Sequence, residues 1–228
     1  MKPEAANRQS SPARAGGNFL YLFAGLLMTL LVLPLTNGMA YLGRYAFTLL
    51  FSVFMLVGVW SLSASRRVFR LGIALVLAVG VITGTGLFSG AHYLEPVGLL
   101  LMLIFAILSC LIAARNVFIW HRADFNSLVG AFCVYLLMGL IWAVLFRLLH
   151  LYGWASFSGN ITEEERQLFP DLVYFSFVTL ASLGYGDIAP VGAVARTFAY
   201  LEAVIGQLYL AVMVASLVGA FISHRSRE

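Results

Sequence analysis

The sequence predicts an all-α membrane protein with six transmembrane helices and one shorter, re-entrant helix. Hydrophobic residues make up 61% of the 228-residue chain and charged residues 11%, whereas soluble domains carry about 25% charged residues. A soluble protein of this composition would have too little polar surface to cover itself. In addition, six uncharged apolar runs are long enough to cross a membrane, and a seventh is too short.

A spanning helix needs about 20 mainly apolar residues to cross about 30 Å of hydrocarbon. The six runs that meet this requirement lie at 19–35 (within a longer uncharged run, 15–43), 45–65, 71–90, 96–114, 125–146 and 203–222. The first run could instead belong to a signal peptide, because Lys2, Arg8 and Arg14 precede it. Residues 1–17 are polar and rich in Gly, Ala and Ser, so we expect a disordered cytoplasmic tail there.

The basic residues predict that both termini face the cytoplasm, because cytoplasmic loops carry an excess of Lys and Arg. In that orientation ten basic residues lie inside and four outside, so the net charge of +4 reflects topology and not nucleic-acid binding. We expect a multi-pass protein of the lipid bilayer, and the preference for Arg over Lys indicates a bacterial inner membrane. The inner set is Lys2, Arg8, Arg14, Arg66, Arg67, Arg70, Arg115, Arg122, Arg225 and Arg227, and the outer set is Arg44, Arg147, Arg166 and Arg196.

Cysteines and histidines give no sign of a metal site or cofactor. Cys110 and Cys133 lie in apolar runs without a CxxC pattern, and the four histidines are scattered. The sequence also contains no recognisable Ser/His/Asp set and no pair of intramembrane acids. We therefore do not expect an enzyme.

The seventh apolar run, 172–186, has 15 residues and ends in a glycine-rich turn. Non-helical backbone can lie at membrane depth only where protein or water satisfies its polar groups, so we expect a re-entrant half-helix followed by a loop. Pro170 and Asp171 are expected to begin the half-helix, since proline suits the first turn and an acid there complements the helix dipole. Its C-terminal end would point toward the membrane centre and stabilise a cation there.

The loop after the half-helix reads Ser182-Leu183-Gly184-Tyr185-Gly186-Asp187. It resembles the Thr-Val-Gly-Tyr-Gly-Asp selectivity filter of the potassium channel family. Gly184 and Gly186 permit the positive φ that alternate residues need if successive carbonyls are to point the same way. The resemblance implies a homotetramer in which four loops bind K+, the permeant ion, through the carbonyls of Ser182, Leu183, Gly184 and Tyr185 and the Ser182 hydroxyl.

Two residues depart from the family pattern. Ser182 stands in place of Thr and lacks the packing methyl, and Leu183 stands in place of Val. Both changes alter the packing of the filter, and neither removes a carbonyl ligand. We expect K+ to be favoured over Na+, with a weakly selective monovalent cation channel as the alternative. A potassium transporter subunit is less favoured, because such proteins fuse several pore-like repeats and this chain has one.

Aromatic residues and Asp187 are expected to hold the filter from behind. Tyr185 would point away from the ion axis and pack against Tyr174 and Phe175 of the half-helix. Asp187 closes the motif at its outer end.

The last helix is expected to run from about Ala193 to Ser223 and to contribute one more support. Glu202 is its one acid, and intramembrane charges usually face partners. Glu202 would bond to Arg147, or to the end of the half-helix near Thr179 and Ser182.

Two small residues of the same helix are also candidates for the pore. Gly206, 20 residues after Gly186, is predicted to be a hinge, and close helix packing is the competing explanation. Ser216 is a candidate pore-facing hydroxyl.

Six spans with a loop before the last resemble the voltage-gated layout, but the fourth span has no basic residue before Arg115. One charge that crosses 100 mV contributes about 2.3 kcal/mol, so we expect little intrinsic voltage sensing. The predicted division is a tail (1–17), a voltage-sensor-like domain without gating charges (18–114), a linker (115–126), a pore domain (127–223) and a short cytoplasmic tail (224–228). We expect no soluble ligand-binding domain in the chain.

Overall fold

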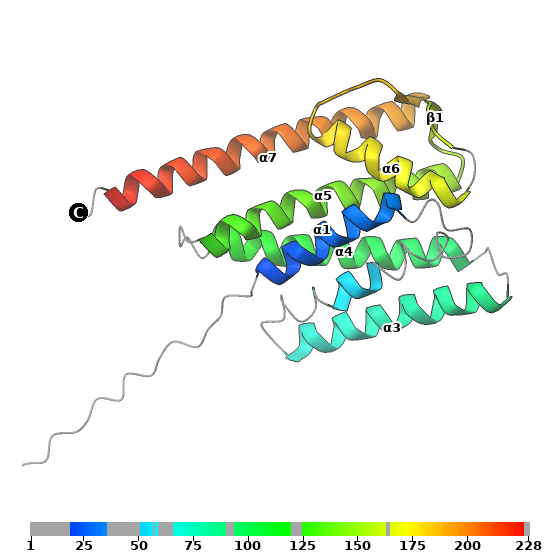
Figure 1. The fold of residues 1–228 in the computed structure, drawn as a ribbon, viewed down its shortest axis with the longest axis horizontal. Helices are drawn as coiled ribbons and strands as arrows, with labels where there is room; N and C mark the ends of the chain where they lie inside the picture. Colours follow the sequence, from blue (N-terminus) through cyan, green and yellow to red (C-terminus); the bar gives the residue numbers. More distant parts are fainter. Residues whose placement is uncertain are drawn as a thin grey trace, which may run out of the picture.

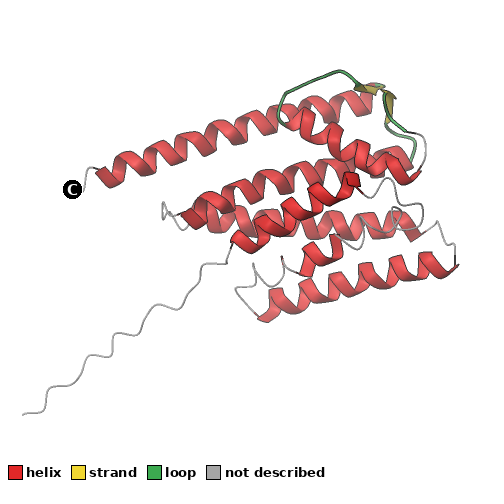
Figure 2. Ribbon diagram, in the orientation of Figure 1, coloured by secondary structure: helices red, strands yellow, loops and turns green. Residues whose placement is uncertain are grey.

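The computed structural model describes residues 19–35, 51–56, 58, 66–89, 94–119, 125–162 and 165–225. Figure 2 shows that most of the described chain is helical, with short strands at one end. The predicted all-α class is therefore confirmed. The elements are α1 (Phe19–Leu35), α3 (Arg66–Ser89), α4 (Glu95–Ile119), α5 (Phe125–Leu151), β1 (Ser156–Gly159), α6 (Glu165–Leu180), β2 (Ile188–Val191) and α7 (Ala193–Arg225).

Three of these helices are long and apolar enough to cross a membrane, and they correspond to the fourth, fifth and sixth predicted spans. The stretches are Glu95–Val117 in α4, Phe125–Leu151 in α5 and Ala193–Ser216 in α7. α1 and α3 carry shorter apolar stretches, Phe19–Val32 and Phe69–Ile82. Of the second predicted span, only 51–56 and 58 are described, and these residues are helical. The rest of that span and the predicted tail 1–17 lie outside the described residues.

The predicted start of the short helix is wrong by five residues. α6 begins at Glu165, and Pro170 lies inside it. Proline removes one backbone hydrogen bond near the start of the helix, but its φ fits a helix. Asp171, expected in the first turn, lies further along the helix and accepts a hydrogen bond from the Thr162 backbone N–H at 2.8 Å. α4 also extends beyond its predicted end: it continues to Ile119, into the predicted linker (115–126). No proline or glycine interrupts the helix between 115 and 119.

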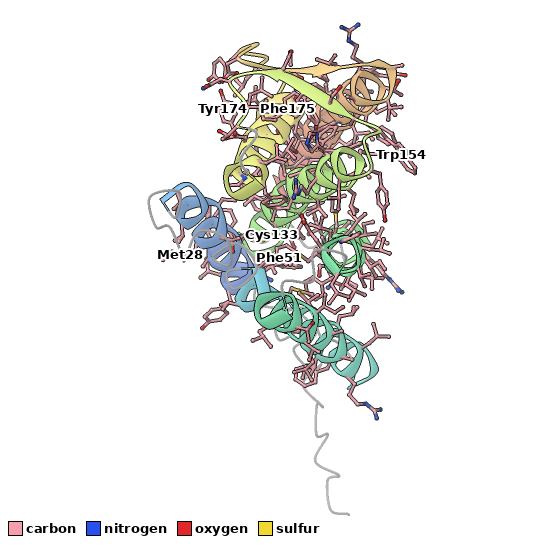
Figure 3. All side chains as sticks on the ribbon, turned by 90° about the vertical axis from the view of Figure 1, so that its right-hand side faces the viewer. Met28, Phe51, Cys133, Trp154, Tyr174 and Phe175 are labelled. Atoms are coloured by element: carbon pink, nitrogen blue, oxygen red, sulfur yellow. The ribbon has the colours of Figure 1, made fainter. Side chains whose placement is uncertain are left out.

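α5 lies at the centre of the described chain (Figure 1). Figure 1 shows α6 and α7 on one side of it and α1, α4 and α3 on the other. In the end-on view of Figure 3, Phe175 of α6, Cys133 of α5 and Phe51 follow one another across the molecule in that order. One apolar core continues from α1 through residues 51–56, α3 and α4 to α5.

Hydrogen bonds fix α1 against α5. The Phe19 backbone N–H donates to Asn126 Oδ1 at 3.1 Å, and Cys133 Sγ donates to the Phe19 carbonyl oxygen at 3.6 Å. α1 therefore packs on the α5 helix of its own chain.

The sequence does not predict either strand, because four residues are too few to show an alternating pattern. β1 lies between α5 and α6, and β2 follows the glycine-rich loop. The strands pair antiparallel, with Ser156 opposite Val191 and Gly159 opposite Ile188. This pairing joins the end of the loop to the segment that follows the C-terminal end of α5.

Candidate functional site

The loop between α6 and β2 has an alternating backbone. φ is +58° at Gly184 and +78° at Gly186, and it is also positive, +55°, at Ser182. The intervening residues, Leu183 and Tyr185, do not have positive φ. Alternation of this kind turns successive carbonyls toward the same side of the chain. The two glycines lie where the sequence predicted positive φ, whereas the third position was not foreseen.

The end of α6 explains the conformation of Ser182. The Ser182 N–H donates to the Thr179 carbonyl, and the Leu183 N–H donates to the Val178 carbonyl, both at 2.9 Å. These two bonds form a Schellman motif, whose first residue beyond the helix takes the left-handed conformation and is usually glycine. The first residue of the candidate filter is thus also the C-terminal cap of α6. Thr179, a predicted filter support, takes part in this cap through its backbone carbonyl.

Two hydrogen bonds hold the outer end of the loop at Asp187. The Tyr174 hydroxyl donates to Asp187 Oδ2 at 2.8 Å, and the Asn160 N–H donates to the Asp187 carbonyl at 2.7 Å. Gly159 approaches the same carbonyl so closely that a Cβ there would clash with it. The predicted supports Asp187 and Tyr174 are therefore in direct contact, and the β1 strand reinforces them from the other side.

The predicted packing of Tyr185 against Phe175 does not occur within one chain. Phe175 is buried and contacts the rings of Phe146 and Phe157, each at a centroid distance of 5.2 Å. Tyr185 is 67% exposed and Leu183 57% exposed. Phe175 faces inward because α6 turns that side toward α5 and β1, so Phe175 supports α6 and not the Tyr185 ring.

At the inner end of the loop, α7 supplies a residue that the sequence did not mark. The Gln207 side-chain amide donates from Nε2 to Ser182 Oγ at 3.0 Å. Gln207 directly follows Gly206 in α7. Its role could be found only once α7 was placed beside the loop.

The predicted bond between Glu202 and Arg147 is wrong. Arg147 binds Glu95 Oε1 instead, with Nη2 at 2.5 Å and Nε at 3.1 Å. Glu202 is fully buried, and its Oε1 lies 2.5 Å from Ser176 Oγ, which in turn lies 2.7 Å from the Gly139 carbonyl oxygen. Gly139 and Arg147 are about 12 Å apart along α5 at 1.5 Å per residue, so Glu202 lies too far inward to reach the arginine.

Gly206 lies at the closest approach of α7 to α6. A Cβ at this position would clash with the carbonyl oxygen of Leu180 and come within 2.9 Å of its Cδ1 atom. α7 continues as one helix through Gly206. The structure therefore supports close packing as the reason for this glycine, and bending at Gly206 stays a prediction.

The ion pair between α4 and α5 gives a testable prediction. We expect Arg147→Ala to destabilise the protein by about 2 kcal/mol, because a buried arginine pair that loses one partner leaves an uncompensated charge, and the partial exposure of Glu95 (32%) reduces the effect. A double-mutant cycle with Glu95→Ala, followed by thermal unfolding in detergent, measures the coupling. Arg196→Ala, at an exposed arginine, is the control and should change stability by less than about 0.5 kcal/mol. Additive effects of the two substitutions would contradict the prediction.

Comparisons with known proteins agree with this geometry. The sequence model of a family described as "Ion channel" matches residues 128–223, which contain nearly all of α5, the loop and most of α7. Protein LctB of Bacillus caldotenax is 39% identical over 101 residues, which are 43% of this chain and 75% of that protein. Protein LctB of Geobacillus stearothermophilus is 33% identical over the same shares of both chains.

A third relative is named as a potassium channel. The inward rectifier potassium channel Kirbac3.1 of Paramagnetospirillum magnetotacticum is 44% identical over 63 residues, which are 27% of this chain and 21% of the channel. No solved structure shows significant similarity to the chain. Together with the alternating loop at the end of a short helix, these matches show that the chain belongs to the potassium channel family of ion channels.

Proposed function

We propose that this chain is the subunit of a K+-selective channel that conducts K+ passively through a tetrameric pore. The observation that carries the proposal is the alternation of positive φ at Ser182, Gly184 and Gly186 directly after the C-terminus of α6. Such a ladder presents carbonyl oxygens that replace the hydration shell of K+. The carbonyls of Ser182, Leu183, Gly184 and Tyr185 and the Ser182 hydroxyl would be the ligands.

The exposed side chains of the filter support a tetramer. Leu183 and Tyr185 are large apolar groups on the surface of one chain, and a neighbouring subunit would cover them. One chain holds one filter loop, and a carbonyl cage around an ion needs four. The mass of the purified protein in detergent tests this assembly.

The rest of the proposal concerns topology. Six spans with both termini in the cytoplasm of a cell membrane, a peripheral domain (18–114), a linker (115–126) and a pore domain (127–223) fit the arginine distribution. Within the apolar stretch of α4, the basic residue is Arg115, near its C-terminal end. We therefore propose that the peripheral domain contributes little voltage sensing.

Current through the reconstituted protein tests the proposal. Purified protein in planar bilayers with K+ on one side and Na+ on the other should reverse near the equilibrium potential of K+. Reversal at equal permeability would favour the weakly selective cation channel, which Ser182 and Leu183 suggest. Absence of current would remove the channel proposal, and transport without unitary currents would favour a transporter subunit. A conductance that rises steeply with voltage would contradict the lack of a sensor.

The Gln207 contact predicts an effect on selectivity. We expect Gln207→Leu to lower the ratio of K+ to Na+ permeability about fivefold, because a side-chain hydrogen bond contributes about 1 kcal/mol and its loss frees the Ser182 hydroxyl to move. The same bi-ionic reversal potential measures the ratio. Ser216→Ala, which removes an exposed hydroxyl from the inner part of α7, is the control and should leave the ratio unchanged. An unchanged ratio in Gln207→Leu would mean that the contact does not order the filter.

A further inference from the structure

Glu202 is a buried acid outside the carbonyl ladder of the candidate filter. It lies on α7, with no exposed surface, and faces Gly139 of α5 and Ser176 of α6. An ionised carboxylate at such a place is costly unless a positive charge or several donors face it. Arg147, the candidate cation, is paired with Glu95. Glu202 therefore lacks the partner that a buried carboxylate needs.

Three oxygens, Ser176 Oγ, the Gly139 carbonyl oxygen and Glu202 Oε1, form two short pairs, and each pair needs one proton between its oxygens. Ser176 Oγ lies 2.7 Å from the Gly139 carbonyl and 2.5 Å from Glu202 Oε1, so both pairs are at hydrogen-bond distance. The serine hydroxyl has one proton to donate. Both a carbonyl and an ionised carboxylate only accept, so an ionised Glu202 would leave one of the two short oxygen pairs without a proton between them.

A neutral Glu202 resolves this conflict. Its own O–H donates to Ser176 Oγ, and the Ser176 O–H then donates to the Gly139 carbonyl. Each oxygen pair has one proton, and the chain of bonds runs from α7 through α6 to α5. The other oxygen, Oε2, is buried with no hydrogen-bond partner among the described residues. An unpaired carbonyl oxygen of a neutral acid is less costly than an unpaired half of a carboxylate.

Among the residues that the structure describes, no group facing Glu202 would favour its charged form. Ser176 and Gly139 do not titrate. Tyr135 of α5 is close enough to interact electrostatically with Glu202, and a tyrosine phenol is uncharged at neutral pH. Asp187 is hydrogen-bonded to Tyr174, which lies two residues before Ser176 in α6, and an acid in this region would oppose a second negative charge.

We infer that Glu202 is a protonated positioning residue, which as a neutral acid donates to Ser176 and ties α7 and α5 to the helix that carries the filter. The same two helices meet again one turn further along, where Gly206 contacts Leu180. The spacing from Ser176 to Leu180 equals that from Glu202 to Gly206, so the two contacts lie side by side. The proton therefore fixes the register of α7 on α6, directly behind the cap at Ser182.

Infrared spectroscopy tests the protonation without requiring a conducting channel. The full-length protein in lipid vesicles at neutral pH should show the C=O stretch of a protonated carboxyl, sensitive to exchange into D2O. The band should be absent in Glu202→Gln and present in Glu95→Gln, the matched control. If the difference spectrum, wild type minus Glu202→Gln, shows carboxylate bands in place of the protonated C=O band, Glu202 is ionised and the inference is overturned. If Glu202→Gln does not assemble, Ser176→Ala is used, which should shift the band; an unshifted band would also overturn it.

The pH dependence of K+ flux gives a second readout, which rests on the proposed channel function. Raising the pH removes the proton from Glu202 and breaks the chain of bonds, so wild-type flux should fall at alkaline pH. Glu202→Gln cannot lose a proton at this site, and its amide can still donate to Ser176, so its flux should stay constant over the same range. Equal pH profiles would exclude Glu202 as the titrating group. A protein that shows the infrared band but no flux would sink the channel proposal and leave the protonated acid in place.

Discussion

Gly206→Ala is expected to abolish K+ flux and to lower the stability of the assembled protein. The added Cβ would clash with the carbonyl oxygen of Leu180 and lie within about 3 Å of two more of its atoms. Backbone cannot move aside as a flexible side chain can, so α7 must move away from the end of α6. Overpacking of this kind costs about 1–3 kcal/mol, and in a tetramer the displacement would occur behind each of the four loops that form the filter.

A second glycine of α7 provides the control. A Cβ at Gly219 would meet nothing within 4 Å, and replacing glycine by alanine within a helix stabilises it by about 1 kcal/mol. Gly219→Ala should therefore be neutral or stabilising, while Gly206→Ala destabilises in spite of the same gain in helix propensity. Thermal unfolding in detergent and flux in vesicles measure the two effects.

The same pair of variants separates packing from hinge bending. If Gly206 served only as a hinge, Gly206→Ala would alter the probability of opening and leave the thermal stability as high as that of Gly219→Ala. Equal melting temperatures for the two variants would therefore contradict the clash. A lowered melting temperature of Gly206→Ala alone supports it.

The second large effect is expected at Gly184, where alanine should remove selective conduction. Gly184 has φ of +58°, and an L-residue in the left-handed region costs about 1–2 kcal/mol. In a tetramer each of the four chains would have this unfavourable conformation around one pore. If the backbone relaxed to a negative φ, a carbonyl that binds the ion would turn away from it. We expect K+ flux to fall to background while the subunits still associate, since nothing lies within 4 Å of the added Cβ in one chain.

Gly153 gives a control with the same backbone penalty. It has φ of +70°, lies in the turn after α5, and also has open space around it. Gly153→Ala should lower stability by a similar amount and leave flux intact. If both variants conduct, or if both lose conduction, the loss does not come from the carbonyl ladder of the filter.

Local chemistry made the backbone conformation of the glycine-rich loop predictable. The positive φ at Gly184 and Gly186 follows from residue type. The contact between Tyr174 and Asp187 joins the short helix to the loop that directly follows it, so the two residues are only 13 positions apart. The cap at Ser182 was not predictable, because a serine in a left-handed conformation is an exception that only the bonds to Val178 and Thr179 explain.

Contacts between distant segments were not predictable from one sequence. Glu202 had two possible partners, and choosing between them required the height of each helix along the membrane, which apolar runs define only to within a turn or two. The alternative near the end of the half-helix was closer to the structure, although the contact is Ser176 and not Thr179 or Ser182. The strands β1 and β2 depend on each other across about 30 residues, so neither has a local signal.

The continuity of α7 has a mechanical consequence. Its 33 residues form one helix of about 50 Å at 1.5 Å per residue, which exceeds the roughly 30 Å of hydrocarbon. From Gly206 to the last helical residue, Arg225, the arm is about 28 Å long. A rotation of about 10° at the contact with Leu180 would displace the far end by about 5 Å. A small rotation of α7 beside the filter loop would therefore produce a large displacement at the far end of the helix. Conversely, a force that moves the far end would be transmitted through the helix to the contact with Leu180.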